Sequence, residues 1–184
     1  MSAFAIFVVG APGVGKTTAL RAMFEELDPA GAAFLTESPK WTVCPGAYAA
    51  AGHYTGGPFD GADTVPYNGA AAAVDALLAN LQAWSVPIVV FDGDRFSART
   101  HLDLARGGGL RVGCVLISAP DEVVAQRRAA RGSAQNENWA RGRATKARNF
   151  FAMFDPAQRA EVDASRLGPK QVAEHILAFA RGLA

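Results

Sequence analysis

The fold of this chain is constrained most by nine consecutive residues near its N-terminus, Gly10-Ala11-Pro12-Gly13-Val14-Gly15-Lys16-Thr17-Thr18. They match the pattern G-x-x-x-x-G-K-[ST] at every fixed position, between an apolar run (4–9) and a helical pattern (17–27). The alternative is a glycine-rich turn that binds no ligand. Such a turn does not need a strand before it, a Lys-Thr pair and a helix after it, and all of these are present here. The sequence therefore predicts a phosphate-binding loop for a nucleoside triphosphate.

The chemistry of such a loop gives each of its residues a role. Glycines let the backbone turn its N–H groups toward a polyphosphate, and the N-terminus of the following helix adds partial positive charge. Lys16 is expected to reach the β and γ phosphates, and the Thr17 hydroxyl is expected to ligate Mg²⁺. The predicted ATP contacts are Gly10, Pro12, Gly13, Val14, Gly15, Lys16, Thr17 and Thr18.

Length and composition point to one compact domain. The chain has 184 residues and a net charge of +1, from 18 basic and 17 acidic residues, so any nucleic-acid contact must be local. Its two cysteines, Cys44 and Cys114, indicate neither a disulfide framework nor a zinc site. The apolar N-terminus lacks a basic region and a cleavage site, and no apolar run approaches about 18 residues. We therefore expect a cytoplasmic protein without a membrane partner.

Alternation of apolar runs with helical patterns predicts an α/β fold. Helical spacing predicts helices over 17–27, 69–84, 97–106 and 122–131 and at the C-terminus. Five strands lie between them, so we predict a single domain (1–184) with a five-stranded parallel sheet covered on both faces. The predicted strands are 4–9, 32–36, 87–91, 111–118 and, more weakly, 160–164.

Carboxylates follow two of the predicted strands, where open α/β sheets bind ligands. Glu37 follows the second strand, although it could equally be an exposed turn residue. Asp92-Gly93-Asp94-Arg95 follows the third, and an aspartate at this place, paired with a phosphate loop, holds Mg²⁺ directly or through water. We predict Thr17 and Asp92 as the metal residues, with Asp94 as the alternative carboxylate.

Residues 38–68 form the least regular stretch and are predicted to be an acceptor-binding loop. Its aromatic residues could stack on a base, or could form the loop's own core. Asp63 adds a carboxylate, and His53 is interpreted as a structural or solvent-facing residue because no catalytic partner for it is identifiable. The proposed stacking residues are Trp41, Tyr48, Tyr54 and Tyr67.

A basic segment, about 126–148, is predicted to be an arginine lid. Residues 121–148 contain seven basic and three acidic residues, and a glycine-containing stretch (132–138) interrupts them like a hinge. A solvated helical face is the ordinary meaning of such a run. A triphosphate-binding chain also needs mobile cations that close over the transferring group, and Arg127 and Arg131 lie four residues apart on one helical face.

The order of these features resembles the nucleoside monophosphate kinase branch of P-loop proteins, which implies the strand order 2-3-1-4-5. Thr36-Glu37-Ser38-Pro39 is similar to the Glu-Pro segment of thymidylate kinases, and Asp94-Arg95-Phe96 to their Asp-Arg-aromatic motif. Gly93 and the segment 44–68 depart from that pattern. Gly52-His53-Tyr54, Gly61-Ala62-Asp63-Thr64, Gln135-Asn136-Glu137 and Gly142-Arg143-Ala144-Thr145-Lys146 look more like bacteriophage P-loop kinases. That group includes kinases that phosphorylate 5-hydroxymethyluracil in DNA. The resemblance implies that the protein acts in the cytoplasm of a phage-infected host cell.

The sequence thus predicts an ATP-dependent kinase acting on a nucleotide-type acceptor, with 5-hydroxymethyluracil in DNA as the first candidate and a free nucleotide as the second. Glu37, Asp63 or Asp94 would orient the acceptor hydroxyl, and the residues do not select among the three. A P-loop switch or motor is the alternative from another class, but the chain lacks an Asn-Lys-x-Asp motif and the third strand does not end in Asp-Glu. The predicted catalytic residues are Lys16, Glu37, Asp94, Arg127 and Arg131, and the predicted acceptor residues are Asp63, Tyr54 and Arg95.

Overall fold

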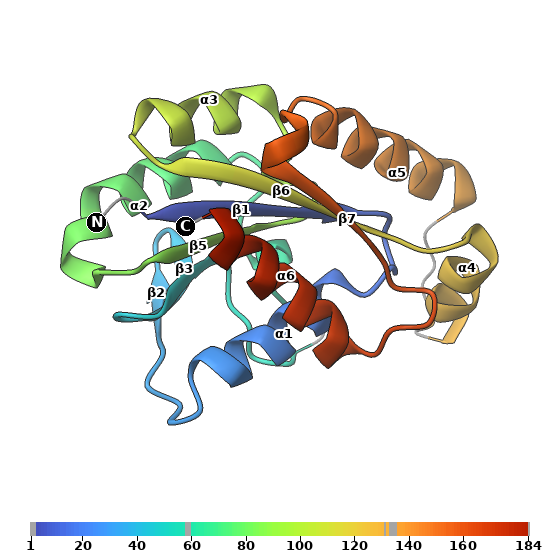
Figure 1. Cartoon of the computed structure of the whole chain (residues 1–184), viewed down its shortest axis with the longest axis horizontal. Helices are drawn as coiled ribbons and strands as arrows, with labels where there is room; N and C mark the ends of the chain where they lie inside the picture. Colours follow the sequence, from blue (N-terminus) through green and yellow to red (C-terminus); the bar gives the residue numbers. More distant parts are fainter. Residues whose placement is uncertain (1–2, 58–59, 131, 133–135, 184) are drawn as a thin grey trace.

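Seven strands form one mixed sheet in the order β2-β3-β4-β5-β1-β6-β7 (Figure 1). The structure is a computed structural model that describes residues 3–57, 60–130, 132 and 136–183. Neighbouring strands from β4 to β7 in this order are parallel, whereas β2 pairs with β3, and β3 with β4, in antiparallel fashion. The strands are β1 (Phe4–Gly10), β2 (Phe34–Glu37), β3 (Lys40–Cys44), β4 (Tyr48–Ala51), β5 (Ile88–Asp92), β6 (Arg111–Ser118) and β7 (Arg159–Asp163).

The predicted five-stranded sheet in the order 2-3-1-4-5 is therefore wrong in strand number. The predicted second strand lies at the outer edge of the sheet, as β2, and is not the neighbour of β5. That neighbour is β4, with Tyr48 opposite Ile88 and Ala50 opposite Val90. The hairpin β2-β3 thus extends the parallel part of the sheet by two antiparallel strands.

Helices cover both faces of the sheet, as predicted. Helices α1 (Lys16–Leu27) and α6 (Pro169–Leu183) pack together on one face, and α2 (Ala70–Trp84), α3 (Arg99–Gly107) and α5 (Glu137–Phe151) lie on the other (Figure 1). Helix α4 (Asp121–Ala130) lies beyond the end of β6, and two short 3₁₀ turns are η1 (Ala62–Thr64) and η2 (Pro156–Gln158). No described helix is long and apolar enough to cross a bilayer.

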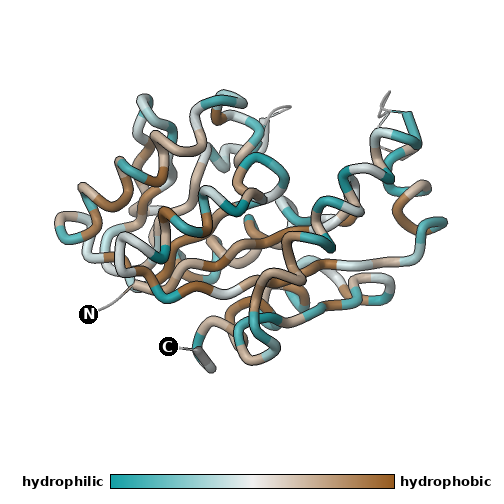
Figure 2. The backbone as a smooth tube through the Cα atoms, turned by 90° about the horizontal axis from the view of Figure 1, so that it is seen from above, coloured by the Kyte–Doolittle hydropathy of each residue, from teal (hydrophilic) through white to brown (hydrophobic). Residues whose placement is uncertain are grey.

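The central strands are buried on both faces because their sequences are apolar without alternation. All but the last residue of β1 is buried, and Figure 2 shows that the backbone at the centre of the molecule is largely in the apolar colour range. Phe7 stacks on Phe91 with ring centroids 4.9 Å apart and contacts Phe150 of α5 at 5.3 Å. Full burial of each such ring contributes roughly 1.5–3 kcal/mol. This packing fixes the C-terminal ends of β1 and β5 beside each other.

The segment 38–68, predicted to be an irregular loop, contains β3, β4 and η1. Trp41 and Tyr48 are buried in the two hydrophobic cores, so the prediction that they stack on an acceptor base is wrong. His53 is buried and its Nε2 lies 2.6 Å from the Thr36 carbonyl oxygen, which confirms its structural interpretation. The aromatic residues of this segment thus serve mostly as core residues.

Gly52 joins β4 to the following loop at a very close backbone approach. Its φ is +98°, and a Cβ atom there would lie 2.1 Å from the Gly61 carbonyl oxygen. We expect Gly52→Ala to lower the free energy of unfolding by roughly 2–4 kcal/mol, through both backbone strain and this clash. Gly46→Ala is the matched control, because Gly46 also has positive φ (+77°) but open space at its Cβ. Its cost should be about 1 kcal/mol in urea unfolding, and equal costs would contradict the close-approach argument.

Candidate active site

The phosphate loop connects the C-terminal end of β1 to the N-terminus of α1. Gly10, Gly13 and Gly15 have φ of +152°, +87° and +107°, and a Cβ on Gly10 would lie 2.3 Å from the Ile117 carbonyl oxygen. Glycine is therefore required where the loop passes β6. Lys16 Nζ donates to the carbonyl oxygens of Gly10 (3.0 Å) and Ala11 (3.1 Å), which holds the ammonium group over the loop. The loop has the shape that its sequence predicts.

Asp92, the last residue of β5, faces the start of α1. The Thr17 hydroxyl donates to Asp92 Oδ2 at 3.1 Å, across 75 positions of sequence. Burial raises the pKa of Asp92 to about 6, although the positive charge of Lys16 opposes this shift. Asp92 Oδ1 is buried and has no hydrogen-bond partner among the described residues. Such an unsatisfied carboxylate oxygen normally has a ligand that compensates its burial.

The Thr17 and Asp92 oxygens fit a magnesium ion. Mg²⁺ prefers oxygen ligands and is held by one or two carboxylates together with substrate phosphates and water, not by a cage made of protein alone. The described part of the chain contains no group of three or more His, Cys, Asp or Glu side chains that could hold a metal. The hydroxyl and the unsatisfied carboxylate oxygen are therefore the donors that a phosphate-bound Mg²⁺ would use.

Tyr54 lies with its hydroxyl group beside Asp92 in the interior. Its ring meets Phe24 edge-on, with centroids 4.8 Å apart, and its buried hydroxyl lies beside Asp92, where burial raises the pKa of Tyr54 well above its ordinary value. A Cβ on Gly61 would lie 3.0 Å from Tyr54 Cε1 and 3.1 Å from Asp92 Oδ2. The side chain is half-buried and also lines the wider cavity described below, so the role of Tyr54 in binding the acceptor stays a prediction.

Five charged side chains from three segments meet just beyond the end of β5. Asp94 forms ion pairs with Arg143 and with Lys146, whose Nζ lies 2.9 Å from Asp94 Oδ1. Arg95 Nε lies 3.6 Å from Asp63 Oδ1, and Arg95 Nη2 donates to the Asp63 carbonyl oxygen at 3.2 Å. We call these residues the acceptor cluster: Asp63, Asp94, Arg95, Arg143 and Lys146. The structure thus brings together the predicted residues Asp63, Asp94 and Arg95.

Arg143 and Lys146 were not among the predicted site residues. Both lie in the basic segment that the sequence predicts to be a lid (about 126–148), but the sequence pattern does not show which of its cations face the sheet. On α5 the two are three positions apart, so they lie on the same side of the helix as each other. Their ion pairs with Asp94, in the Asp-Arg motif, identify them as residues of the candidate site.

Glu37 lies away from this cluster. It ends β2, and strands β3 and β4 separate β2 from β5. At about 4.8 Å between neighbouring strands, this is roughly 14 Å from β5 and 19 Å from β1. The side chain of Glu37 is exposed. The structure therefore does not bring Glu37 to the phosphate loop, and its predicted catalytic role lacks the required proximity.

Arg127 of α4 lies at a pocket of about 350 Å³ beside the phosphate loop. One guanidinium nitrogen donates to the Val14 carbonyl oxygen (2.9 Å) and the other to that of Ala164 (2.8 Å). The two nitrogens thus connect the phosphate loop to the β7-α6 loop. A role for Arg127 in the transition state requires it to exchange these carbonyls for phosphate oxygens. Arg131 lies outside the described residues. The pocket is lined by Gly13, Val14, Gly15, Thr18, Ala19, Ile117, Arg127, Ala130, Ala164, Leu167, Pro169 and Val172.

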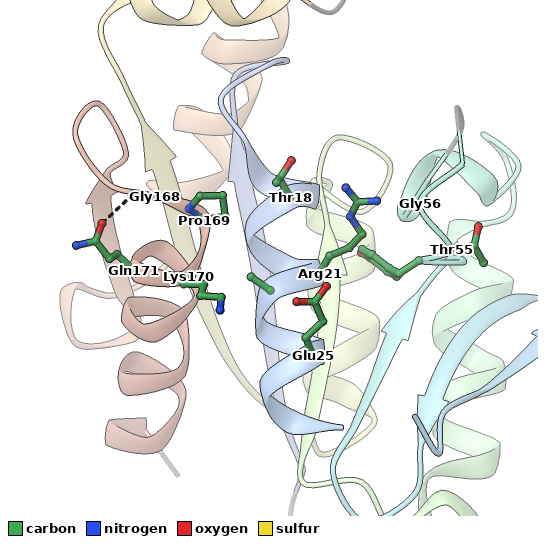
Figure 3. Close-up of a pocket in the computed structure, with 11 residues that line it drawn as sticks. Thr18, Arg21, Glu25, Thr55, Gly56, Gly168, Pro169, Lys170 and Gln171 are labelled. Carbon is green, nitrogen blue, oxygen red and sulfur yellow. Dashed lines mark hydrogen bonds between the residues drawn. The ribbon is translucent and has the colours of Figure 1, made fainter. Parts of the chain in front are cut away.

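A wider cavity of about 830 Å³ adjoins this pocket between α1 and α6 (Figure 3). Thr18 and Pro169 line both, so the two pockets are neighbours. Arg21 of α1 pairs with Asp60 at 3.5 Å, which ties α1 to the loop after β4. The phosphate loop therefore has an apolar pocket on its α6 side and the acceptor cluster beyond β5.

We expect Arg127→Ala to weaken ATP binding more than it slows turnover. The truncation removes the link between Val14 and Ala164 and one wall of the pocket, so the KM for ATP should rise by roughly 5- to 30-fold with a smaller change in kcat. Arg99→Ala, which removes an exposed arginine at the start of α3, is the control for loss of positive charge and should leave the KM for ATP unchanged. A fall in kcat with an unchanged KM for ATP would instead support the transition-state role predicted from the sequence.

The phosphate loop and the buried aspartate at the end of the neighbouring strand, on a parallel core covered by helices, define a nucleotide-binding P-loop protein. The match to a family model of P-loop kinases makes it a P-loop kinase. More specifically, the chain belongs to the P-loop Nucleotide Kinase3 family, whose family model matches residues 1–179. A search of curated proteins finds no match.

Solved structures share the fold over nearly the whole chain. A tunicamycin resistance protein from Deinococcus radiodurans has 22% identity and a TM-score of 0.55, and the match covers 96% of this chain and 94% of that one. A sugar kinase from a Janibacter species has 18% identity and a TM-score of 0.54, with 97% and 95% covered. The APS kinase of Mycobacterium tuberculosis, solved with AMPPNP and APS, has 14% identity and a TM-score of 0.50, with 98% of both chains covered. At these identities the likeness establishes the fold alone.

Proposed function

We propose that this protein transfers the γ-phosphate of ATP to a hydroxyl group of a nucleotide-type acceptor. The observation that carries the proposal is the position of the acceptor cluster. Its residue Asp94 lies two positions after Asp92, just beyond the end of β5. A Cβ on Gly93, between the two aspartates, would lie 3.6 Å from Lys16 Cε. Donor and acceptor groups would thus meet at the same end of β5. Cations in the cluster suit an acceptor that carries phosphate.

The residues of the phosphate loop would bind the donor. Lys16 would exchange its two carbonyl partners for phosphate oxygens and neutralise charge that develops in the transition state. Thr17 and Asp92 would hold Mg²⁺, which in such sites neutralises phosphate charge and orients the triphosphate. The pocket at Arg127 would take the nucleoside, because its lining is mostly apolar and adjoins Thr18 at the start of α1.

Of the three predicted carboxylates, we propose that Asp94 orients the acceptor hydroxyl. It follows Gly93, where a Cβ atom would lie 3.6 Å from Lys16 Cε, whereas the side chain of Asp63 is 75% exposed and Glu37 lies on the outer strand. The hydroxyl oxygen would bond to the γ-phosphorus, the bond from that phosphorus to the β–γ bridging oxygen would break, and ADP would leave. The hydroxyl proton would pass to Asp94, which Arg143 and Lys146 hold in position.

Within this class we propose 5-hydroxymethyluracil in phage DNA as the acceptor, as the motif resemblance implies. Its hydroxymethyl group supplies the oxygen that thymine lacks. In duplex DNA that group lies in the major groove and cannot reach the candidate site at the end of β5. The base must therefore be flipped out of the duplex, or the DNA must be single-stranded.

Transfer of radiolabelled γ-phosphate, measured side by side on several acceptors, tests this proposal. We expect label in DNA that contains 5-hydroxymethyluracil, preferentially in single strands or mismatches, and none in ordinary thymine DNA. Efficient labelling of thymidine monophosphate, with none in the modified DNA at low salt, would instead assign a free-nucleotide kinase.

Salt dependence provides a separate expectation for a DNA acceptor. If the three cations of the acceptor cluster contact backbone phosphates, raising salt from about 50 to 200 mM should increase the KM for single-stranded DNA by about 20-fold, through lost counterion release. The KM for ATP in the same titration is the control and should change much less. A KM for DNA that is insensitive to salt would contradict backbone contacts by these cations.

A further inference from the structure

Two exposed aromatic residues and two arginines alternate at the outer side of the acceptor cluster. The Arg95 guanidinium lies over the Tyr67 ring, 5.7 Å from its centroid, and the Arg143 guanidinium lies over the Trp139 ring at 5.3 Å. The Tyr67 hydroxyl also interacts with Arg143 and, together with the charge of Asp94, raises the pKa of that guanidinium. The four side chains therefore form one connected group, which we call the aromatic row: Arg95, Tyr67, Arg143 and Trp139.

The exposure of the two rings is not explained by packing. Tyr67 is 68% exposed, and Trp139 is 38% exposed, whereas Trp41 and Tyr48 are almost fully buried. Tyr67 precedes α2 and Trp139 lies in the first turns of α5, so the two rings reach the site from separate segments. Exposed aromatic residues at a ligand site commonly bind a planar group.

The arginines of the row are fixed by the acceptor cluster itself. Arg95 pairs with Asp63, and Arg143 pairs with Asp94, which lies two residues beyond the end of β5. Rings that stack on these guanidiniums are thereby held beside the position proposed for the acceptor hydroxyl. A guanidinium plane and a phenol or indole ring both offer flat faces to a base, and the cations complement backbone phosphate.

We propose that the aromatic row is a stacking platform for unpaired bases of single-stranded nucleic acid, an inference that rests on the proposed function and adds which residues receive the bases. The exposed faces of Tyr67 and Trp139 stack on the target base or its neighbour. Arg95 and Arg143 keep the rings oriented, and Lys146 adds charge for the backbone. Stacking of this kind tolerates any base, so the row selects single-stranded over double-stranded nucleic acid and not sequence.

Binding of a fluorescein-labelled, thymine-rich single-stranded DNA oligonucleotide to the full chain, measured by anisotropy, tests the platform without any transfer reaction. Tyr67→Ala and Trp139→Ala should each weaken binding about 10-fold, while the dependence of affinity on salt stays unchanged because no charge is lost. Tyr67→Phe and Trp139→Phe should retain most of the affinity, since they keep a ring. Phe34→Ala is the matched control, because Phe34 is 42% exposed on the outer strand β2.

The alternative is that the row only fastens α5 to the segment before α2. In that case the alanine variants would lower the melting temperature or raise the KM for ATP while binding the oligonucleotide as the wild type does, and this result overturns the platform. Phosphorylation of free nucleotides with no ring-dependent DNA binding would overturn it as well and leave the kinase proposal intact. Ring-dependent DNA binding without transfer to any nucleotide-type acceptor would support the platform and contradict the proposed function.

Discussion

Lys16→Ala is expected to abolish phosphoryl transfer while leaving the fold intact. Lys16 bonds to two carbonyl oxygens of its own loop and packs no apolar core, so its removal should change the melting temperature little. The loss of one such charge from a transition state costs on the order of 10²- to 10³-fold in rate. Single-turnover transfer of label from ATP measures this loss apart from product release.

Lys40→Ala is the control for this variant. Lys40 begins β3 at the far side of the sheet, so the same change of charge there should leave transfer unchanged. Near wild-type transfer by Lys16→Ala, with unchanged melting, would contradict the proposed role of the phosphate loop.

Asp92→Asn is expected to abolish transfer and to stabilise the protein. The variant keeps the shape of the side chain but loses the charge that would hold Mg²⁺, so Mg²⁺-dependent transfer should fall on the order of 100-fold. Without Mg²⁺ and ATP, the ionised carboxylate is buried with one unsatisfied oxygen, which opposes folding. Removing that charge should therefore raise the free energy of unfolding at neutral and higher pH.

The sign of the pH dependence follows from the raised pKa of Asp92. The folded protein has a pKa of about 6 at this carboxyl, against an ordinary value of 3.8 for the unfolded chain. Between these values the folded state holds more protons, so this group's contribution to wild-type stability falls as pH rises from about 4 to 6 and stays low above 6. The variant should exceed the wild type by roughly 1–3 kcal/mol at pH 8 and by almost nothing near pH 3.5.

Urea unfolding in EDTA at the two pH values measures this difference. Asp103→Asn, which changes an exposed aspartate of α3, is the control and should have no such pH-dependent effect. A variant that is less stable than the wild type at pH 8 would show that Asp92 has a favourable partner in the folded protein.

The central strands could be predicted from sequence because their apolar runs are unbroken. The run Ile88–Asp92 and the run Phe4–Gly10 each end at functional residues, so strand and site were identified together. Strand β4 could not be found in the same way. Its sequence, Tyr48-Ala49-Ala50-Ala51, has no β-branched residue, and its strand conformation depends on pairing with β3 and β5.

In the candidate site, too, some features follow from consecutive residues and others depend on contacts between distant parts of the chain. The phosphate loop is encoded in consecutive residues, and its glycines have the backbone angles that the pattern requires. The pairing of Asp94 with Arg143 and Lys146 spans about 50 positions and depends on where α5 docks. Charge count alone identified a basic segment there, but only the packing of α5 against β1 and β6 selects which of its cations reach the site.

The most direct test of the whole account measures ADP release with and without an acceptor, alongside label transfer to that acceptor. The account predicts little ADP release from ATP alone, and one phosphate transferred for each ADP formed when a nucleotide-type acceptor is present. Both should disappear together in Lys16→Ala. ADP release that is stimulated by a protein or polymer, with no label in that partner, would contradict the account and identify a P-loop switch or motor.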